Sequence, residues 1–130
     1  MNRIDFLKSF FAGSALLFLP KTGVEKPVRE IRLSSPYVAG FQYYQGAEVE
    51  PQLRENDMLT LKRESTNPHD CYAIEVFQNN AKLGYLPRVE NKVIARLMDQ
   101  GIAVKARILK IDPEEFASRK VKIKVFYETT

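Results

Sequence analysis

The sequence predicts a mainly β domain with one or two helices: a small barrel of about six strands with one amphipathic helix. Short segments rich in β-branched and aromatic residues alternate with turn residues along most of the chain. One stretch, residues 88–100, instead has apolar residues at helical spacing. The chain of 130 residues suits a single domain, and closing a few short strands into a barrel removes exposed sheet edges.

The first half of the domain is expected to hold three strands. Residues 28–33 alternate weakly, and residues 37–44 are rich in aromatic and β-favouring residues. The turn residues Ser-Ser-Pro at 34–36 separate these two strands. Residues 46–51, which begin with Gly and end with Pro, are expected to form a loop or a single helical turn. Residues 58–62 follow as a short buried strand.

A β-hairpin is the clearest element in the sequence. Residues 72–77 alternate in the manner of a strand, residues 78–80 (Gln-Asn-Asn) form a turn, and residues 82–86 return as the second strand. Gly84 within this second strand predicts a bulge or a close approach of another segment. Cys71, just before the hairpin, is expected to be a small buried thiol.

One helix and two strands complete the domain. Residues 88–100 are predicted to be an amphipathic helix that packs on the sheet, with Gly101 as its C-terminal cap. Its expected buried face consists of Val89, Val93, Ile94, Leu97 and Met98. Residues 102–111 and 120–127 are the final strands, and the second of them alternates strictly between apolar and mostly basic positions.

The N-terminal segment differs from the rest of the chain. Residues 1–23 have a charged start followed by an apolar run that is shorter than a membrane span, as in an export signal or an anchor. Membrane association through residues 1–20 is therefore one expectation, and a cytoplasmic helix is the alternative. Residues 24–27 are assigned to a linker and residues 28–130 to the domain.

Composition and charge exclude several classes of function. A single cysteine and a single histidine cannot supply a disulfide framework or a Cys/His metal site, and we expect no cofactor. The net charge is +4, but Arg3, Lys8 and Lys21 against Asp5 contribute half of it. The folded part is only mildly basic, so any contact with nucleic acid must be local rather than a continuous basic stripe.

Several motifs, taken in order, resemble the HIRAN domain, a module of helicase-like DNA repair translocases that also occurs as a free-standing bacterial protein. No single motif is specific, but their order and spacing jointly are. They cover most of the chain after Pro36. The motifs are residues 38–44 (Val-Ala-Gly-Phe-Gln-Tyr-Tyr), 59–64 (Leu-Thr-Leu-Lys-Arg-Glu), 67–70 (Asn-Pro-His-Asp), 72–76 (Tyr-Ala-Ile-Glu-Val), 82–88 (Lys-Leu-Gly-Tyr-Leu-Pro-Arg) and 95–101 (Ala-Arg-Leu-Met-Asp-Gln-Gly).

The resemblance implies an OB-like barrel that binds the 3' end of single-stranded DNA. By position, Tyr43 and Tyr44 match the aromatic pair that stacks on terminal bases, and Asp70 matches the carboxylate that accepts the terminal hydroxyl. Asn67 and His69 belong to the same loop. The remaining candidates would lie near phosphates: Gln42, Lys62, Arg63 and Arg88. The translocases have Arg where this chain has Gln42, and Gln cannot neutralise a phosphate.

The residues leave other interpretations open. Tyr43 and Tyr44 would point to opposite faces of a strand, which places one of them in the core. Residues 67–70 could be only a turn. An exported or anchored barrel that binds a protein, peptide or glycan is the alternative function. A hydrolase would rest on His69 and Asp70 alone, without a nucleophile or metal cluster, so we expect no enzyme.

Overall fold

The computed structural model describes residues 27–113 and 119–130. The chain divides into two compact units, Met1–Arg29 with Thr130, and Glu30–Thr129; the account below concerns the second. The predicted segment 1–23, its membrane association through residues 1–20 and most of the linker lie outside the described residues. No helix within the described residues is long and apolar enough to cross a membrane.

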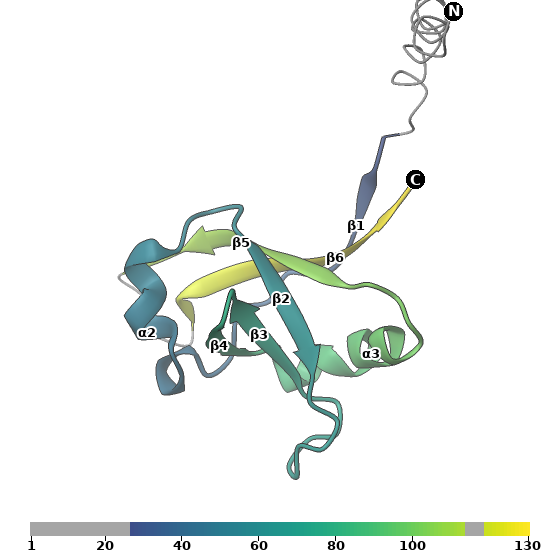
Figure 1. The fold of residues 1–130 in the computed structure, drawn as a ribbon, viewed down its shortest axis with the longest axis horizontal. Helices are drawn as coiled ribbons and strands as arrows, with labels where there is room; N and C mark the ends of the chain where they lie inside the picture. The colour runs from purple at the N-terminus through teal and green to yellow at the C-terminus, as the bar shows by residue number, and fades with distance from the viewer. Residues whose placement is uncertain (1–26, 114–118) are drawn as a thin grey trace, which may run out of the picture. The chain divides into compact units, whose positions relative to one another are not determined.

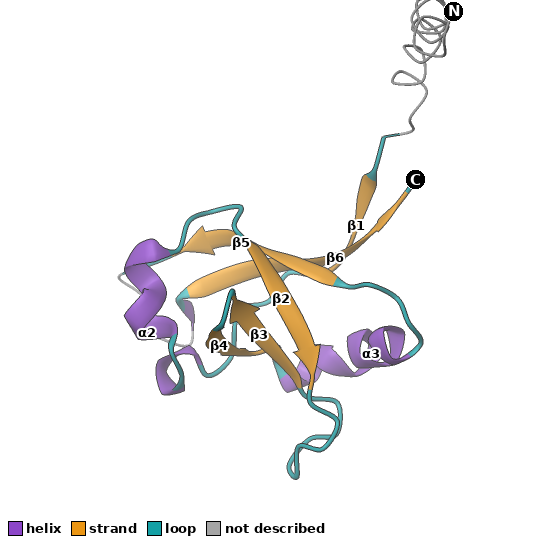
Figure 2. Cartoon of the chain, in the orientation of Figure 1, coloured by secondary structure: helices purple, strands orange, loops and turns teal. Residues whose placement is uncertain are grey.

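The elements are mainly β, as the sequence predicts (Figures 1 and 2). In chain order they are β1 (Arg29–Ser34), η2 (Phe41–Tyr43), α2 (Gly46–Val49), η3 (Glu50–Gln52), β2 (Met58–Arg63), β3 (Ile74–Gln78), β4 (Ala81–Tyr85), α3 (Arg88–Asp99), β5 (Lys105–Ile111) and β6 (Val121–Thr129). The strands form one 6-stranded sheet in the order β1-β6-β5-β2-β3-β4. In Figure 1, α2 and α3 lie on opposite sides of the strands.

The predicted hairpin is confirmed as β3 and β4, and β2 pairs antiparallel with β3 on its other side. Asn79 in the turn has a φ of 56°, a left-handed conformation that Asn tolerates better than most residues. The loop between β2 and β3, residues 64–73, extends away from the strands in Figure 2. This loop carries the Asn-Pro-His-Asp sequence.

The strands β5 and β6 supply much of the core through strict alternation. Val121, Ile123 and Val125 of β6 are fully buried, beside Ala106 and Ile108 of β5. The opposite face carries Lys and Arg, as the sequence predicts, although Phe126 on that face is also buried. Two cationic groups, of Arg107 and Lys124, lie over its ring at 5.0 and 5.4 Å.

The prediction of a strand over residues 37–44 is wrong in its second half. Tyr37 and Ala39 form isolated bridges to β6 and β4, and the chain then turns at Gly40 (φ 75°) into the 3-10 helix η2. The aromatic residues that favour a strand serve a different purpose here, because Phe41 is the side chain that enters the core. Both Tyr43 and Tyr44 are exposed, so the expectation that one of them is buried is also wrong.

The residues 37–39 close the sheet because they lie between β6 and β4. Ala39 and Tyr85 exchange two backbone hydrogen bonds, and Val38 N donates to Val121 O. Gly84 permits this contact, since a Cβ atom there would lie 2.2 Å from the carbonyl oxygen of Ala39. The close approach expected at Gly84 is therefore confirmed.

The helix α3 is confirmed, and of its five expected buried residues Ile94 is buried and Leu97 and Met98 pack against the core, but the two valines do not. Asn91, Ile94 and Ala95 are buried, whereas Val89 and Val93 are 89% and 64% exposed. The buried residues recur at i, i+3 and i+4, and the two valines lie on the other side of the helix. Counting apolar residues alone missed Asn91, a polar side chain that the core-facing side of the helix includes. Cys71 is exposed, which corrects the expectation of a buried thiol.

Candidate functional site

A cavity of about 250 Å³ lies where five parts of the domain meet. The segment 37–39, which closes the sheet, and the residues after η2 form one wall. The loop between β2 and β3 forms a second wall, and the end of β4 with the start of α3 forms the rest. Its lining consists of Ala39, Tyr44, Asn67, His69, Asp70, Ala73, Tyr85, Leu86 and Arg88. The cavity therefore brings together residues from positions 39 to 88 of the chain.

The Asn67 side chain organises the loop beside the cavity. Its Oδ1 accepts hydrogen bonds from the backbone N–H groups of His69 (2.8 Å) and Asp70 (3.0 Å). Its Nδ2 donates to Glu64 Oε1 at 2.8 Å. Asn residues stabilise turns in this way. Asn67 is thus committed to holding the loop, and the interpretation of residues 67–70 as a turn describes it correctly.

The carboxylate of Asp70 is held by three partners at the edge of the cavity. Oδ1 accepts from the backbone N–H of Tyr72 at 2.9 Å, and Oδ2 accepts from Asn91 Nδ2 at 2.9 Å. Arg88 Nε lies 3.5 Å from Oδ2, and its guanidinium also donates to the carbonyl of His69 at 2.7 Å. The Asp70 side chain is 16% exposed. A carboxylate has about four acceptor positions, so these contacts leave acceptor capacity for a ligand.

These partners keep Asp70 ionised. Partial burial raises the pKa of this carboxyl, but the hydrogen bonds from Asn91 and Tyr72 N and the charge of Arg88 outweigh it, and the net effect lowers the pKa from its usual value. No hydrogen bond joins the carboxylate to the ring of the exposed His69 among the described contacts. The pair His69 and Asp70 on which a hydrolase would rest is therefore not assembled.

We expect this carboxylate to contribute stability that acid removes. Because its folded pKa is lowered, the contribution is present above the unfolded pKa of about 3.9 and is lost as pH falls through the folded pKa. The difference in free energy of unfolding between the wild type and Asp70→Asn should be constant near neutral pH and shrink below about pH 4. Urea unfolding at a series of pH values measures it. A difference that persists unchanged in strong acid would contradict this assignment.

An aromatic and cationic cluster adjoins the cavity through Tyr44 and Tyr85, which line it. The rings of Tyr44 and Tyr85 are 5.7 Å apart at an interplanar angle of 69°, an edge-to-face arrangement. Lys82 Nζ lies 4.3 Å from the centre of each ring. Tyr44 is 40% exposed, so part of its ring remains open to a ligand. The cation over both rings favours one orientation of Tyr44.

Lys82 and Tyr85 connect this cluster to the loop. Lys82 Nζ lies 3.0 Å from Glu75 Oε2 and donates to the Tyr85 hydroxyl at 2.9 Å. The hydroxyl donates to Glu64 Oε1 at 2.6 Å, the same oxygen that Asn67 contacts. Burial and this hydrogen bond raise the pKa of Tyr85, so the phenol keeps its proton. Burial lowers the pKa of Lys82, but Tyr85 and Glu75 reverse this and the net pKa is raised.

The structure gathers some of the predicted site residues and separates others. Tyr44, Asn67, His69, Asp70 and Arg88 line the cavity. Four other candidates lie outside it: Gln42, Tyr43, Lys62 and Arg63.

The four outside the cavity differ in what they do. Gln42 and Tyr43 are exposed on η2. Lys62 lies 6.0 Å from the ring centre of Phe77. Arg63 holds the structure together: its guanidinium pairs with Asp99 at 2.9 Å and donates to the carbonyls of Cys71 and Ala73. Arg63 is thus not free to bind a phosphate.

Sequence reasoning missed Lys82, Tyr85 and Asn91. Lys82 and Tyr85 belong to a motif that the resemblance already included, but nothing in the sequence showed that their side chains meet Tyr44. Asn91 is a polar residue on the buried side of α3 and is 2% exposed. A lone Asn at a core position of a helix is the signal that could have found it, because a buried amide needs a partner.

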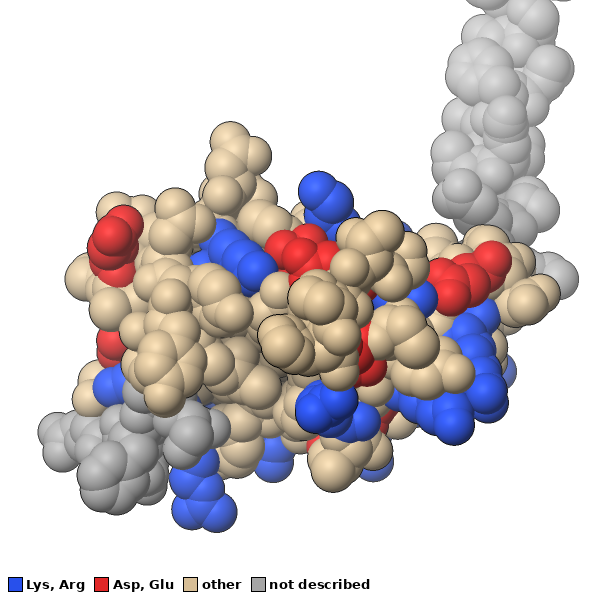
Figure 3. Space-filling model, turned by 90° about the horizontal axis from the view of Figure 1, so that it is seen from below, with Lys and Arg blue, Asp and Glu red and all other residues tan. Residues whose placement is uncertain are grey.

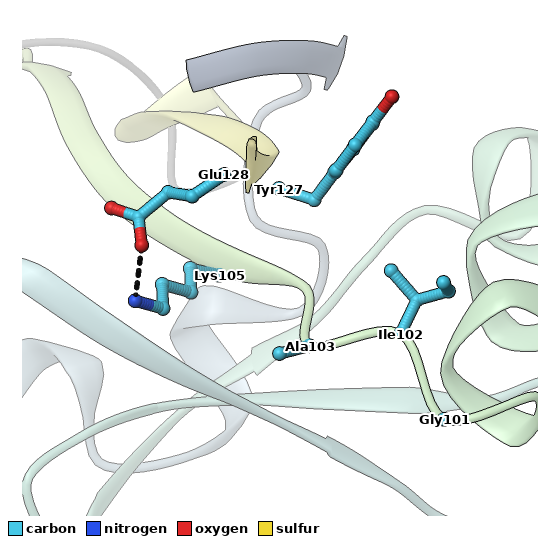
Figure 4. Close-up of a pocket in the computed structure, with 6 residues that line it drawn as sticks. All are labelled: Gly101, Ile102, Ala103, Lys105, Tyr127 and Glu128. Atoms are coloured by element: carbon cyan, nitrogen blue, oxygen red, sulfur yellow. Dashed lines mark hydrogen bonds and ion pairs between the residues drawn. The ribbon is translucent and has the colours of Figure 1, made fainter. Parts of the chain in front are cut away.

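The rest of the described surface gives weaker evidence of a binding site than the cavity beside Asp70. A larger cavity of about 430 Å³ is lined by Gly101, Ile102, Ala103, Lys105, Tyr127 and Glu128. Its charged residues, Lys105 and Glu128, pair with each other at 2.7 Å (Figure 4). On the face that Figure 3 shows, Lys and Arg form separate patches with Asp and Glu between them. Within residues 27–113 and 119–130, no three His, Cys, Asp or Glu side chains gather as metal ligands.

Comparisons with known proteins agree with this architecture. The family model of the HIRAN domain matches residues 31–130. A crystal structure of a protein from Lactobacillus plantarum superposes with a TM-score of 0.69 at 27% identity, and covers 80% of this chain and 100% of that one. The crystal structure of the HIRAN domain of human HLTF gives 0.60 at 20% identity, over 79% and 80% of the two chains. This second likeness concerns the fold, and the predicted OB-like architecture is confirmed by it.

A curated relative is similar in sequence over part of the chain. The helicase-like transcription factor of Oryctolagus cuniculus is 35% identical over 68 residues. These residues are 52% of this chain but 6% of the relative, so this chain spans only a small part of that protein's length. The family match, which extends over most of the chain, identifies the protein as a member of the HIRAN domain family.

Proposed function

We propose that this HIRAN domain is a non-catalytic module that binds single-stranded nucleic acid and takes a free 3' end into the cavity. The observation that carries the proposal is the cavity itself, which places the partly exposed ring of Tyr44 and the ionised carboxylate of Asp70 around one space. Family membership supports the same ligand, since the resemblance implies DNA-end binding.

The chemistry of the lining favours an end over an interior nucleotide. An aromatic face stacks on any base, for about 1–3 kcal/mol per base. A carboxylate accepts a hydrogen bond from a terminal hydroxyl but repels a phosphate. The Arg88 side chain is 72% exposed beside Asp70, so it can turn toward a neighbouring phosphate without leaving the surface.

Tyr44 should matter more than Tyr43 for binding. Tyr44 lines the cavity, whereas Tyr43 is 75% exposed outside it. We expect Tyr44→Ala to cost about 1–3 kcal/mol, or about 5- to 150-fold in Kd for a fluorescent single strand. Tyr43→Ala serves as the matched control and should cost clearly less. Equal losses in fluorescence anisotropy titrations would contradict the assignment of Tyr44 as the stacking residue.

Gln42→Arg tests the departure from the family pattern. Gln42 is exposed just before the tyrosines, at the position where the translocases have Arg. An added cation that contacts one phosphate should steepen the slope of log K against log salt by about 0.7 for a single strand. We expect tighter binding at about 50 mM salt and a smaller gain at about 200 mM. Gln52→Arg, at an exposed Gln of η3 outside the cavity, is the control for added charge alone.

A further inference from the structure

The segment that closes the sheet leads away from the cavity along the surface. Val38 is fully buried, and Tyr37 and Ala39 flank it in extended chain. Because alternate residues of an extended segment point to opposite sides, Tyr37 and Ala39 both face away from the core. Ala39 lines the cavity. The side chain of Tyr37 therefore stands on the same side as the cavity, about 7 Å along the segment.

A cation accompanies Tyr37. The backbone of Tyr37 forms a β-bridge with Lys122 of β6. The Nζ of this lysine lies 5.7 Å from the centre of the tyrosine ring. Directly across the β5–β6 ladder from Lys122 is Lys110. Like charges directly opposite one another destabilise a strand pair. Two lysines in this arrangement create a positive spot beside an aromatic ring.

Among the described residues, acidic side chains pair with the neighbouring cations of this face but not with Lys110 or Lys122. Arg107 and Lys124 are also opposite each other, and Glu30 pairs with both, at 2.8 Å from Lys124 Nζ. Further along the same face Lys105 pairs with Glu128 (Figure 4). Within the described parts of the chain, no ion pair involves Lys110 or Lys122.

We propose that Tyr37, Lys110 and Lys122 form a second subsite for the strand whose 3' end occupies the cavity. This inference rests on the proposed function and extends it to the length of strand that is bound. A cavity of about 250 Å³ is smaller than typical pockets for drug-sized ligands, so it encloses little more than a terminal nucleoside. The next base can stack on Tyr37, and its phosphates can meet the two lysines.

The test compares a single nucleotide, the shorter strand, with an oligonucleotide of about 8 nucleotides, the longer strand. Both have a free 3'-hydroxyl, and OB folds bind about 4–16 nucleotides. The proteins are the full chain, Lys122→Gln, and Lys105→Gln as a control on the same face. We expect the wild type to bind the longer strand more tightly. Lys122→Gln should weaken binding of the longer strand at least about threefold, lower its salt slope by about 0.7, and leave the shorter strand unchanged. Lys105→Gln should change neither.

The outcomes separate this subsite from the proposed function. If Lys122→Gln binds the longer strand as the wild type does, or if Lys105→Gln weakens it equally, the subsite is overturned while binding in the cavity stands. If both lengths weaken equally in Lys122→Gln, the lysine belongs to the end-binding site and the second subsite is also overturned. If the wild type binds neither strand, the proposed function fails, and the subsite fails with it.

Discussion

Asp70→Asn is expected to remove the preference for a 3'-hydroxyl over a 3'-phosphate. In the wild type the carboxylate accepts from the hydroxyl, and a phosphate brought beside it would meet like charge, which costs several kcal/mol. The preference should therefore be about tenfold or more in Kd. The amide keeps one oxygen for Tyr72 N and carries no charge. Affinity for the 3'-hydroxyl strand should fall and affinity for the 3'-phosphate strand should rise.

Asp57→Asn is the matched control for this change. Asp57 also accepts from a backbone N–H, that of Arg54 at 2.9 Å, and it lies just before β2, whereas the Asn67 loop follows the other end of that strand. It loses the same charge without touching the cavity. A preference that survives in Asp70→Asn, or that Asp57→Asn reduces as much, would show that Asp70 does not read the strand end.

Gly84→Ala is expected to be the most destabilising small substitution in the domain. The added Cβ would lie 2.2 Å from the carbonyl oxygen of Ala39 and 2.8 Å from a methyl carbon of Val38, and Gly84 has a φ of 153°. Backbone strain and overpacking each cost about 1–3 kcal/mol, so we expect a loss of about 3 kcal/mol or more in the free energy of unfolding. The segment 37–39 must move away from β4, which would also open the cavity.

Gly101→Ala separates the two contributions to this loss. Gly101 has a φ of 96°, but nothing lies within 4 Å of the position of its Cβ. Its cost should be limited to backbone conformation, about 1 kcal/mol. Denaturant unfolding of both variants gives the comparison. Equal losses would show that close contact with Ala39 does not determine the need for glycine at position 84.

The sequence could predict the strands because local signals specify them. The β3–β4 hairpin has turn residues between two β-favouring runs, and β6 alternates strictly, so neither assignment needs distant contacts. Residues 41–43 were misassigned for the same reason. Their aromatic content favours a strand, but Gly40 has a left-handed conformation and the side chain of Phe41 is buried in the core. The chain therefore turns into η2 at this point. Tertiary packing overrides β-propensity here.

The site was predictable only as far as its motifs reach. Tyr44, Asp70 and the loop that carries Asp70 were found because the resemblance covers them. The contact between Asp70 and Asn91 joins residues 21 positions apart. Lys82 of β4 lies over the ring of Tyr44, which follows η2. Such pairs depend on how β4 and α3 pack, which periodicity does not report. Arg63 was instead assigned to the site wrongly. It was predicted to lie near a phosphate, but its guanidinium donates to loop carbonyls and so holds the loop.

The central claim is that the cavity beside Asp70 binds a free 3' end, and one titration tests it most directly. Two fluorescent single strands of identical sequence, one ending in a 3'-hydroxyl and the other in a 3'-phosphate, are titrated with the wild-type chain at constant salt. We predict that the hydroxyl strand binds about tenfold or more tightly. Equal affinity for the two strands, or no binding of either, would contradict the account.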